Sequence, residues 1–402
     1  MKSQRIALNV GVLYTVVIIV ALTFAIRASN NMVQTTIPLL ARYDLSYSQF
    51  LVGVLVASLS ASALVSSLLN SAIRARFRKK LFVLASIAYP LTIFLFSFSS
   101  PVSVLVFVIA SGLSYGFIFP NIMTSAGLFQ DRNVRERILA IYTLALGVSL
   151  IVGPALESLI VARYSLRSAF LFFVPLGIIG AVLSPFVRFP EERKVERRSS
   201  VWAHPGFKVG IYTFLVYSMS TALILSFGGI FAKQSYDASY SLVILLFAAF
   251  FTASFTTRAL FSVLKIESIF PYVMLMMSIS ILGLVMVFLS HNIVIYALAF
   301  VILGIPHGLG MPIAMFSIGR SFTMEERNVA NSYFTSTMML MMVIMPVLGG
   351  SFLNIVGFKS LLLFITPGVI VLMMLTLKTF MSQKAQKGRS ENRSELTHGG
   401  LG

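Results

Sequence analysis

The sequence predicts an all-α membrane protein of twelve transmembrane helices, arranged as two pseudo-symmetric six-helix bundles. A mean hydropathy of +0.91 with only 11% charged residues leaves too little polar surface for a soluble protein of 402 residues. Runs of about 20 apolar residues recur along the chain, and each can cross about 30 Å of hydrocarbon as a helix. The third observation is an internal repeat, which relates the two halves of the chain.

The internal repeat pairs residues that lie 192 positions apart. The pairs at this spacing are Gly112/Gly304, Gly116/Gly308, Pro120/Pro312, Ser125/Ser317, Gly127/Gly319, Arg135/Arg327, Pro154/Pro346 and Pro175/Pro367. A second set, at 193, joins Tyr43, Asp44, Ser46, Tyr47 and Ser48 to Tyr236, Asp237, Ser239, Tyr240 and Ser241. Transporters are commonly built from such repeats, with the substrate path between them.

The apolar runs place the twelve helices in order along the chain. Their centres lie near residues 25, 60, 90, 115, 150, 178, 220, 252, 279, 306, 340 and 370. We predict an N-terminal bundle over 1–187, a polar linker over 188–208, a C-terminal bundle over 209–380 and a disordered tail over 381–402. The first run follows Lys2 and Arg5 like a signal peptide, but it is too long for one, so we expect a retained helix.

The net charge of +18 reflects membrane topology. With both termini inside, the inner segments hold 24 of the 31 Lys and Arg residues and the outer loops hold 5. This asymmetry is the positive-inside pattern, so we expect both termini in the cytoplasm and the protein in the plasma membrane. It also removes the reason to expect a nucleic-acid partner. We expect a monomer in the lipid bilayer.

The residue inventory excludes several kinds of chemistry. There is no cysteine, so the chain has no disulfide, thiol nucleophile or thiolate metal site, and we expect no cofactor. An intramembrane enzyme needs several catalytic groups together, whereas the spans supply one carboxylate, Glu157, and one histidine, His307, on different helices. We therefore expect no enzyme. No nucleotide-binding loop is present, so we expect transport to be driven by an ion or solute gradient. A sodium site usually needs several clustered oxygen ligands, whereas the spans supply one carboxylate, so protons are the more suitable coupling ion.

Several local patterns resemble the major facilitator superfamily over about residues 10–380. Gly147, Gly153 and Pro154 in the fifth helix resemble its drug:proton antiporter branch, and Arg167 with Ala169, Phe170 and Pro175 resembles its entry into the sixth helix. The segment 70–80 keeps the basic residues of the family's loop between helices 2 and 3, but it lacks the family's Asp and glycines. The resemblance implies alternating access, a cavity lined by helices 1, 4, 7 and 10, and lipid-facing helices 3, 6, 9 and 12. It also implies structural or gating roles for Gly147, Gly153 and Pro154.

The first helix carries the sharpest constellation of polar residues. Its members, which share an arc of roughly 100°, are Thr23, Arg27, Asn30, Asn31 and Gln34. Arg27 lies near the midplane, where a guanidinium costs about 3 kcal/mol or more unless it meets a partner or a substrate. We hypothesise that Arg27 binds an anionic group of the substrate while Asn30, Asn31 and Gln34 supply hydrogen bonds. The alternative is an arginine that fixes helix packing.

Three other ionisable residues within the spans have two interpretations each. Glu157 is the candidate for proton coupling, or an interfacial acid paired with Arg163 or Arg167. His307 is a candidate for substrate binding and proton coupling, or a hydrogen-bonded structural histidine. Arg258 is a gating residue, or it extends its charge to the cytoplasmic interface.

Asn121 and Thr124 share a face of the fourth helix that either lines the cavity or forms hydrogen bonds between helices. The leading functional hypothesis is a proton-coupled secondary transporter of a small organic solute. Arg27 favours uptake or exchange of organic anions, and the glycines of the fifth helix favour efflux of amphiphilic drugs by proton antiport. A channel or a sensor that retains the transporter fold is the remote alternative.

Overall fold

The computed structural model describes residues 10–126, 128, 131–189, 201–264, 266–322 and 324–398. In this part of the chain every regular element is a helix. The first half contains α1 (Val10–Leu39), the π-helix η1 (Leu40–Asp44), α2 (Gln49–Ala72), α3 (Ala75–Phe96), α4 (Ser103–Ala126), α5 (Arg132–Val161), α6 (Leu166–Leu183) and the 3-10 helix η2 (Ser184–Phe186). The second half contains α7 (Pro205–Leu223), the π-helix η3 (Ile224–Gly228), α8 (Gly229–Tyr236), α9 (Tyr240–Val263), α10 (Phe270–Leu289), α11 (Ile293–Ser321), α12 (Met324–Val356), α13 (Phe358–Leu363) and α14 (Ile365–His398).

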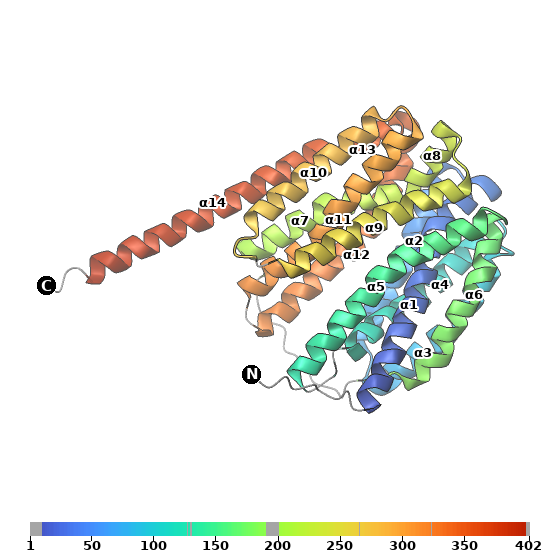
Figure 1. Ribbon diagram of the computed structural model, residues 1–402, viewed down its shortest axis with the longest axis horizontal. Helices are drawn as coiled ribbons and strands as arrows, with labels where there is room; N and C mark the ends of the chain where they lie inside the picture. The colour runs from blue at the N-terminus through green and yellow to red at the C-terminus, as the bar shows by residue number, and fades with distance from the viewer. Residues whose placement is uncertain are drawn as a thin grey trace.

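Twelve helical spans among the described residues are long and apolar enough to cross a membrane, which confirms the predicted fold class. Two spans are composite: the first joins α1 to η1 over Leu13–Asp44, and the seventh joins α7, η3 and α8 over Pro205–Tyr236. The helices of the two halves form two bundles that lie side by side (Figure 1).

The repeat has a structural counterpart where the second span of each half begins. Ser48 caps α2 and Ser239 caps α9, and each side chain accepts a hydrogen bond from the backbone N–H three residues on. Two residues before the caps, Ser46 and Asp237 adopt left-handed backbone angles, with φ of 57° and 51°. These pairs are 191 residues apart, so the loop register of 193 inferred from the sequence is wrong. Serines recur every second residue in this loop, at Ser46 and Ser48 and at Ser239 and Ser241, and only the cap geometry selects between the registers.

Glycines of the repeat let neighbouring helices touch through their backbones. A Cβ atom added at Gly112 would lie 2.4 Å from the carbonyl oxygen of Leu59, and one at Gly304 would lie 2.3 Å from that of Phe250. Gly116 and Gly308 show the same crowding one turn further along. Gly112 and Gly116 therefore fix the contact of α4 with α2, and Gly304 and Gly308 fix the contact of α11 with α9, as expected of small residues at membrane helix interfaces.

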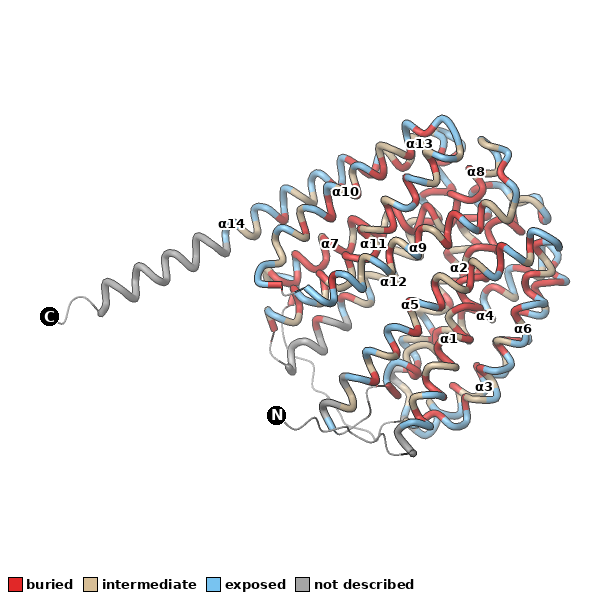
Figure 2. The backbone as a smooth tube through the Cα atoms, viewed as in Figure 1, coloured by how far each residue is buried: buried red, intermediate tan, exposed pale blue. Residues whose placement is uncertain are grey.

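The helix packing separates a central layer from a peripheral one. The spans built on α1 and α7 are the most buried of the twelve, whereas the span containing α14 is among the least buried. α3 and α6 pack within the first half, and α10 and α14 pack within the second. Figure 2 shows the same division, with buried backbone in α1, α7 and α11 and exposed backbone along α3, α6 and α10. The packing of α3, α6, α10 and α14 within their own halves is what the expected lipid-facing positions of spans 3, 6, 9 and 12 require, whereas burial does not distinguish them, because spans 2 and 11 are less buried than span 3.

The two halves meet through α2 against α12 and α5 against α9. At the end of the molecule that carries Asp44 and Ser239, the Tyr43 hydroxyl donates to the Ile230 carbonyl oxygen at 3.1 Å. At the same end Ser158 donates to the Ser241 carbonyl oxygen at 2.9 Å. We call this the closed end. At the opposite end, the linker end, the second half has a hydrophobic core of its own around Phe207, Phe214 and Phe334.

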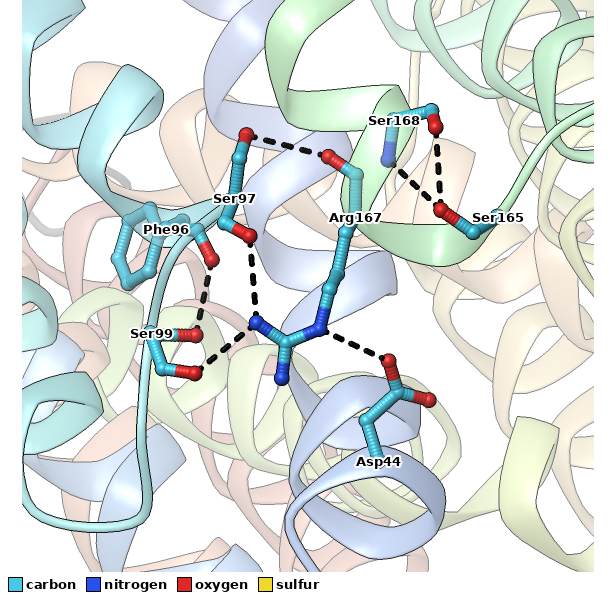
Figure 3. Close-up of polar contacts among 7 residues, drawn as sticks. All are labelled: Asp44, Phe96, Ser97, Ser99, Ser165, Arg167 and Ser168. Atoms are coloured by element: carbon cyan, nitrogen blue, oxygen red, sulfur yellow. Dashed lines mark hydrogen bonds and ion pairs between the residues drawn. The ribbon is translucent and has the colours of Figure 1, made fainter.

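One ion pair ties three loops together at the closed end of the first half (Figure 3). Arg167, at the start of α6, places Nε 3.3 Å from the Asp44 carboxylate. Its Nη1 donates to the carbonyl oxygens of Ser97 at 3.2 Å and Ser99 at 2.9 Å. In the second half Lys359, 192 residues later, donates to the Ser290 carbonyl oxygen. The repeat therefore preserves a cation that binds the loop after the third span of each half.

We expect Arg167→Ala to lower the apparent melting temperature by roughly 5 °C and Asp44→Asn by roughly 2 °C. The arginine change removes two charge-assisted hydrogen bonds besides the ion pair, and the aspartate change removes only the ion pair. Thermal unfolding of the purified variants measures both effects. Equal losses for the two variants would contradict the role assigned to the carbonyl contacts.

Most of the predicted linker, residues 190–200, lies outside the described residues, as do 1–9 and 399–402. α14 continues to His398 through part of the stretch predicted to be disordered. Lys, Gln, Glu and Arg are good helix formers, and extending an existing helix avoids the cost of nucleation.

Candidate functional site

Arg27 lies about midway along the first span, and aromatic residues of α4 hold it. Its Nη1 donates to the Tyr115 hydroxyl, and its guanidinium carbon lies 5.0 Å from the centre of the Phe119 ring. The two rings stack on each other at 5.4 Å. Its Nε atom is buried and has no hydrogen-bond partner. The guanidinium therefore keeps donor capacity for a further acceptor.

The other members of the α1 stripe divide between packing and free polar groups. Asn31 donates to the Ser149 carbonyl oxygen of α5 at 3.3 Å, so it joins two helices. The amide nitrogen of Asn30 is buried without a hydrogen-bond partner, and so is the hydroxyl group of Thr23. Gln34 is half-buried. Unpaired amide and hydroxyl groups beside Arg27 are suited to a polar ligand.

Glu157 is fully buried near the closed end of α5 and meets hydroxyl groups of α1. Thr35 donates to one carboxylate oxygen at 2.6 Å, and Thr36 donates to the other. The alternative that Glu157 pairs with Arg167 is wrong, because Arg167 pairs with Asp44, and Arg163 is exposed. Thr35 and Thr36 lie on the face of α1 that packs against α5. The sequence did not predict these contacts, because short hydroxyl residues in a helix usually bond to their own backbone.

Arg258 is the second guanidinium of the site. It is about 18 residues from the closed end of α9 and Arg27 is about 17 from that of the first span, so both lie roughly 25 Å along the helix from the closed end. Its Nε atom is buried, and among the described residues the side chain has no hydrogen-bond partner and no carboxylate. The charges of Arg258 and Arg27 lie within electrostatic range of each other. The sequence does not show that α9 packs against α5, and the interpretation that Arg258 extends its charge to the cytoplasmic interface stays a prediction.

His307 lies beside the arginines in a largely aromatic environment. Its Nδ1 atom is 2.7 Å from the Ser254 hydroxyl of α9. The rings of Tyr217, Phe250 and Phe251 surround the imidazole with centroids 5.2 to 5.9 Å away. Both Arg27 and Arg258 lie within electrostatic range. With a serine hydroxyl at its Nδ1 and aromatic rings around it, His307 is suited to a hydrogen-bonding role.

The two polar residues predicted on α4 have different surroundings. Asn121 is buried and its amide donates to the side-chain oxygen of Asn70 at 2.8 Å, which joins α4 to α2. Thr124 is exposed and donates to the Pro120 carbonyl oxygen of its own helix. The Asn121 contacts match the helix-packing interpretation.

The glycines of α5 occupy contact points with other helices. A Cβ atom at Gly147 would lie 2.1 Å from the Phe255 ring of α9, across the two halves. One at Gly153 would lie 3.1 Å from the Ala28 carbonyl oxygen of α1. Pro154 lies inside α5. These residues shape the contacts of α5, and none of them offers a side-chain group to a ligand.

The arrangement can bind negative charge between the two halves. Two guanidinium groups, one from α1 and one from α9, lie at one depth with unpaired N–H groups, and the described residues place no carboxylate in contact with either. Their mutual repulsion in a medium of low dielectric constant favours a bound anion.

Comparison with known proteins places the chain among membrane transporters. The family model described as Major Facilitator Superfamily matches residues 19–264 and 209–399. A bacterial homologue of the human lysosomal transporter Spinster, inward-facing and occupied, is 14% identical with a TM-score of 0.63, covering 92% of this chain and 93% of its own. A mutant of the nucleoside transporter NupG is 12% identical with a TM-score of 0.70, covering 91% and 100%. The POT family transporter PepTSo is 10% identical with a TM-score of 0.73, covering 93% and 99%. No curated protein sequence matches.

Proposed function

The chain belongs to the Major Facilitator Superfamily, and from that premise we propose that it is a proton-coupled secondary transporter of a small organic anion. Alternating access moves a bound solute by rocking two halves about a site near the midplane. The substrate's anionic group binds between Arg27 of α1 and Arg258 of α9. Asn30, Thr23 and His307 supply neutral hydrogen-bonding groups around it.

The observation that carries the proposal is the pair of unneutralised guanidinium groups at one depth, one from each half. A substrate that bridges them binds both halves at once, which couples its presence to their relative position. Drug efflux has weaker support, because Gly147 and Gly153, which favoured it, are explained by helix contacts.

The positive-inside pattern supports an orientation for this cycle. It places the linker end in the cytoplasm and the closed end outside. The closed end is sealed by Tyr43 and Ser158 against the second half, and we propose that substrate exchanges with the cytoplasm through the linker end in this state.

Transport into proteoliposomes tests the proposal. Purified protein is reconstituted without and with an imposed pH gradient, and uptake is measured for organic anions and for cations of the same size. We expect anion transport that responds to the pH gradient, with cations moving at least about 10-fold more slowly. Transport restricted to cations, or currents of channel magnitude, would contradict the proposal.

Glu157 is the proposed proton carrier, because it is a buried carboxyl group with hydroxyl partners on α1 and no cation in contact among the described residues. We expect Glu157→Gln to reduce gradient-driven accumulation by roughly 10-fold and to leave anion exchange at equal pH within about 2-fold. Both are measured in the same proteoliposomes. If accumulation persists unchanged, the coupling group lies elsewhere.

A further inference from the structure

A cavity lies at the closed end, remote from Arg27 and Arg258. Its volume is about 310 Å³, at the small end of the range for ligand pockets. Its apolar wall consists of Phe227, Ile230, Phe231, Leu353 and Phe358, most of them buried. Polar side chains stand beside this wall, so the cavity has the mixed lining of a site for an amphipathic molecule.

The polar side chains of the cavity specify the chemistry of a ligand. Arg42 contributes a cation that keeps free N–H groups, since only its Nη1 is used, in a bond to the Tyr47 carbonyl oxygen. Gln49 is 7% exposed, and its side-chain oxygen is buried without a hydrogen-bond partner. A buried carbonyl oxygen without a partner is stabilised by a hydrogen-bond donor, which a ligand can supply. Gln234 and Asn354 are exposed at the rim.

The walls of the cavity belong to both halves of the protein. Arg42 and Gln49 come from the first half, and Phe227, Leu353 and Phe358 come from the second. Beside the cavity, α2 and α12 are in backbone contact: a Cβ atom at Gly350 would lie 2.7 Å from the Gln49 carbonyl oxygen. The Tyr43 hydroxyl bonds to the carbonyl of Ile230, another wall residue. Separation of the halves at this end therefore divides the cavity.

We propose that this cavity is a regulatory site for a small aromatic acid, which holds the closed end shut. The carboxylate binds Arg42, the ring packs against Phe227 and Phe358, and a hydroxyl group donates to the Gln49 oxygen. Because only the closed state assembles both walls, the ligand stabilises that state by its differential affinity and slows transport.

Calorimetric titration of the purified protein tests the binding. The probe is 4-hydroxyphenylacetate, compared with phenylacetate, which lacks the hydroxyl, and with tyramine, which has the opposite charge. All titrations use the Arg27→Ala variant, which removes binding at the central site. We expect 4-hydroxyphenylacetate to bind and tyramine to bind at least about 10-fold more weakly. Equal binding of the two, or no binding of the acid, overturns the proposal.

Two substitutions assign the contacts. Arg42→Ala should weaken 4-hydroxyphenylacetate at least about 10-fold. Gln49→Leu should abolish the preference for 4-hydroxyphenylacetate over phenylacetate and leave phenylacetate binding unchanged, a comparison within one variant that does not depend on its stability. A hydroxyl preference that survives Gln49→Leu overturns the assignment.

Distance measurement tests the effect on conformation. The chain has no cysteine, so Arg163→Cys and His291→Cys, both in exposed loops at the closed end, provide two spin-label sites without other changes. We expect 4-hydroxyphenylacetate to increase the population with the shorter distance, and to do so less in a Gln49→Leu background. Binding with an unchanged or longer distance overturns the regulatory role.

Discussion

Arg27→Ala is expected to reduce transport of an anionic solute at least about 30-fold, because it leaves the substrate's charge without its α1 partner at the membrane midplane. The protein should remain folded, since among the described residues Arg27 makes one hydrogen bond, to Tyr115, and one ring contact, to Phe119. Arg27→Lys keeps the charge but not the planar donor group, so we expect an intermediate loss. Initial uptake rates in proteoliposomes, normalised to the amount of protein, compare the unchanged protein, Arg27→Ala and Arg27→Lys.

Tyr115→Phe is the matched control for Arg27. It keeps the ring that stacks on Phe119 and removes the hydroxyl that accepts from the guanidinium. We expect this variant to change the substrate concentration at half-maximal rate by less than about 3-fold. Unchanged anion affinity in Arg27→Ala would assign Arg27 to helix packing.

Gly53→Ala is expected to arrest the transport cycle in a protein that still folds. Gly53 of α2 lies at the crossing with α12, where an added Cβ atom would be 2.2 Å from the Pro346 carbonyl oxygen. Overpacking at such a contact costs about 1–3 kcal/mol, which shifts a conformational equilibrium by about 5–150-fold. Because this contact exists only between the two halves, the cost falls on the closed end and spares each bundle. Spin labels at Arg163→Cys and His291→Cys should report a longer distance.

Two other glycines provide controls for Gly53→Ala. Gly116 makes a similar contact, 2.2 Å from the Ala63 carbonyl oxygen, but within the first half, so Gly116→Ala should lower thermal stability and leave the label distance unchanged. A Cβ atom added at Gly319 would meet no atom of another described helix within 4 Å, and Gly319→Ala should behave as the unchanged protein. Normal transport and an unchanged distance in Gly53→Ala would show that this crossing does not limit the cycle.

The fold was predictable because lipid imposes strict rules on a chain. Each span must be apolar for about 20 residues and must satisfy its own backbone hydrogen bonds, so span number and type appear directly in the sequence. The close helix contacts at Gly112 and Gly304 were predictable for a related reason, because a small residue at a helix interface is needed wherever two backbones touch. The loop register was not, because two alignments of the same short residues are equivalent until the caps are seen.

The site was only half predictable. The depth of Arg27 follows from its place in the first span, and a charge at that depth indicates function whatever surrounds it. Its relation to Arg258 does not follow, since the two residues are far apart in sequence and on non-equivalent helices of the two halves. The same holds for the hydroxyl partners of Glu157 and for the closed-end cavity.

The sequence by itself determined the twelve spans, the duplication and the position of one buried cation, because hydrophobic length and the cost of charge in lipid act locally along the chain. The tertiary structure alone decided which residues of the two halves face each other. Those pairings depend on the rotation and crossing of α2 with α12 and of α5 with α9, which side-chain packing sets over the whole interface.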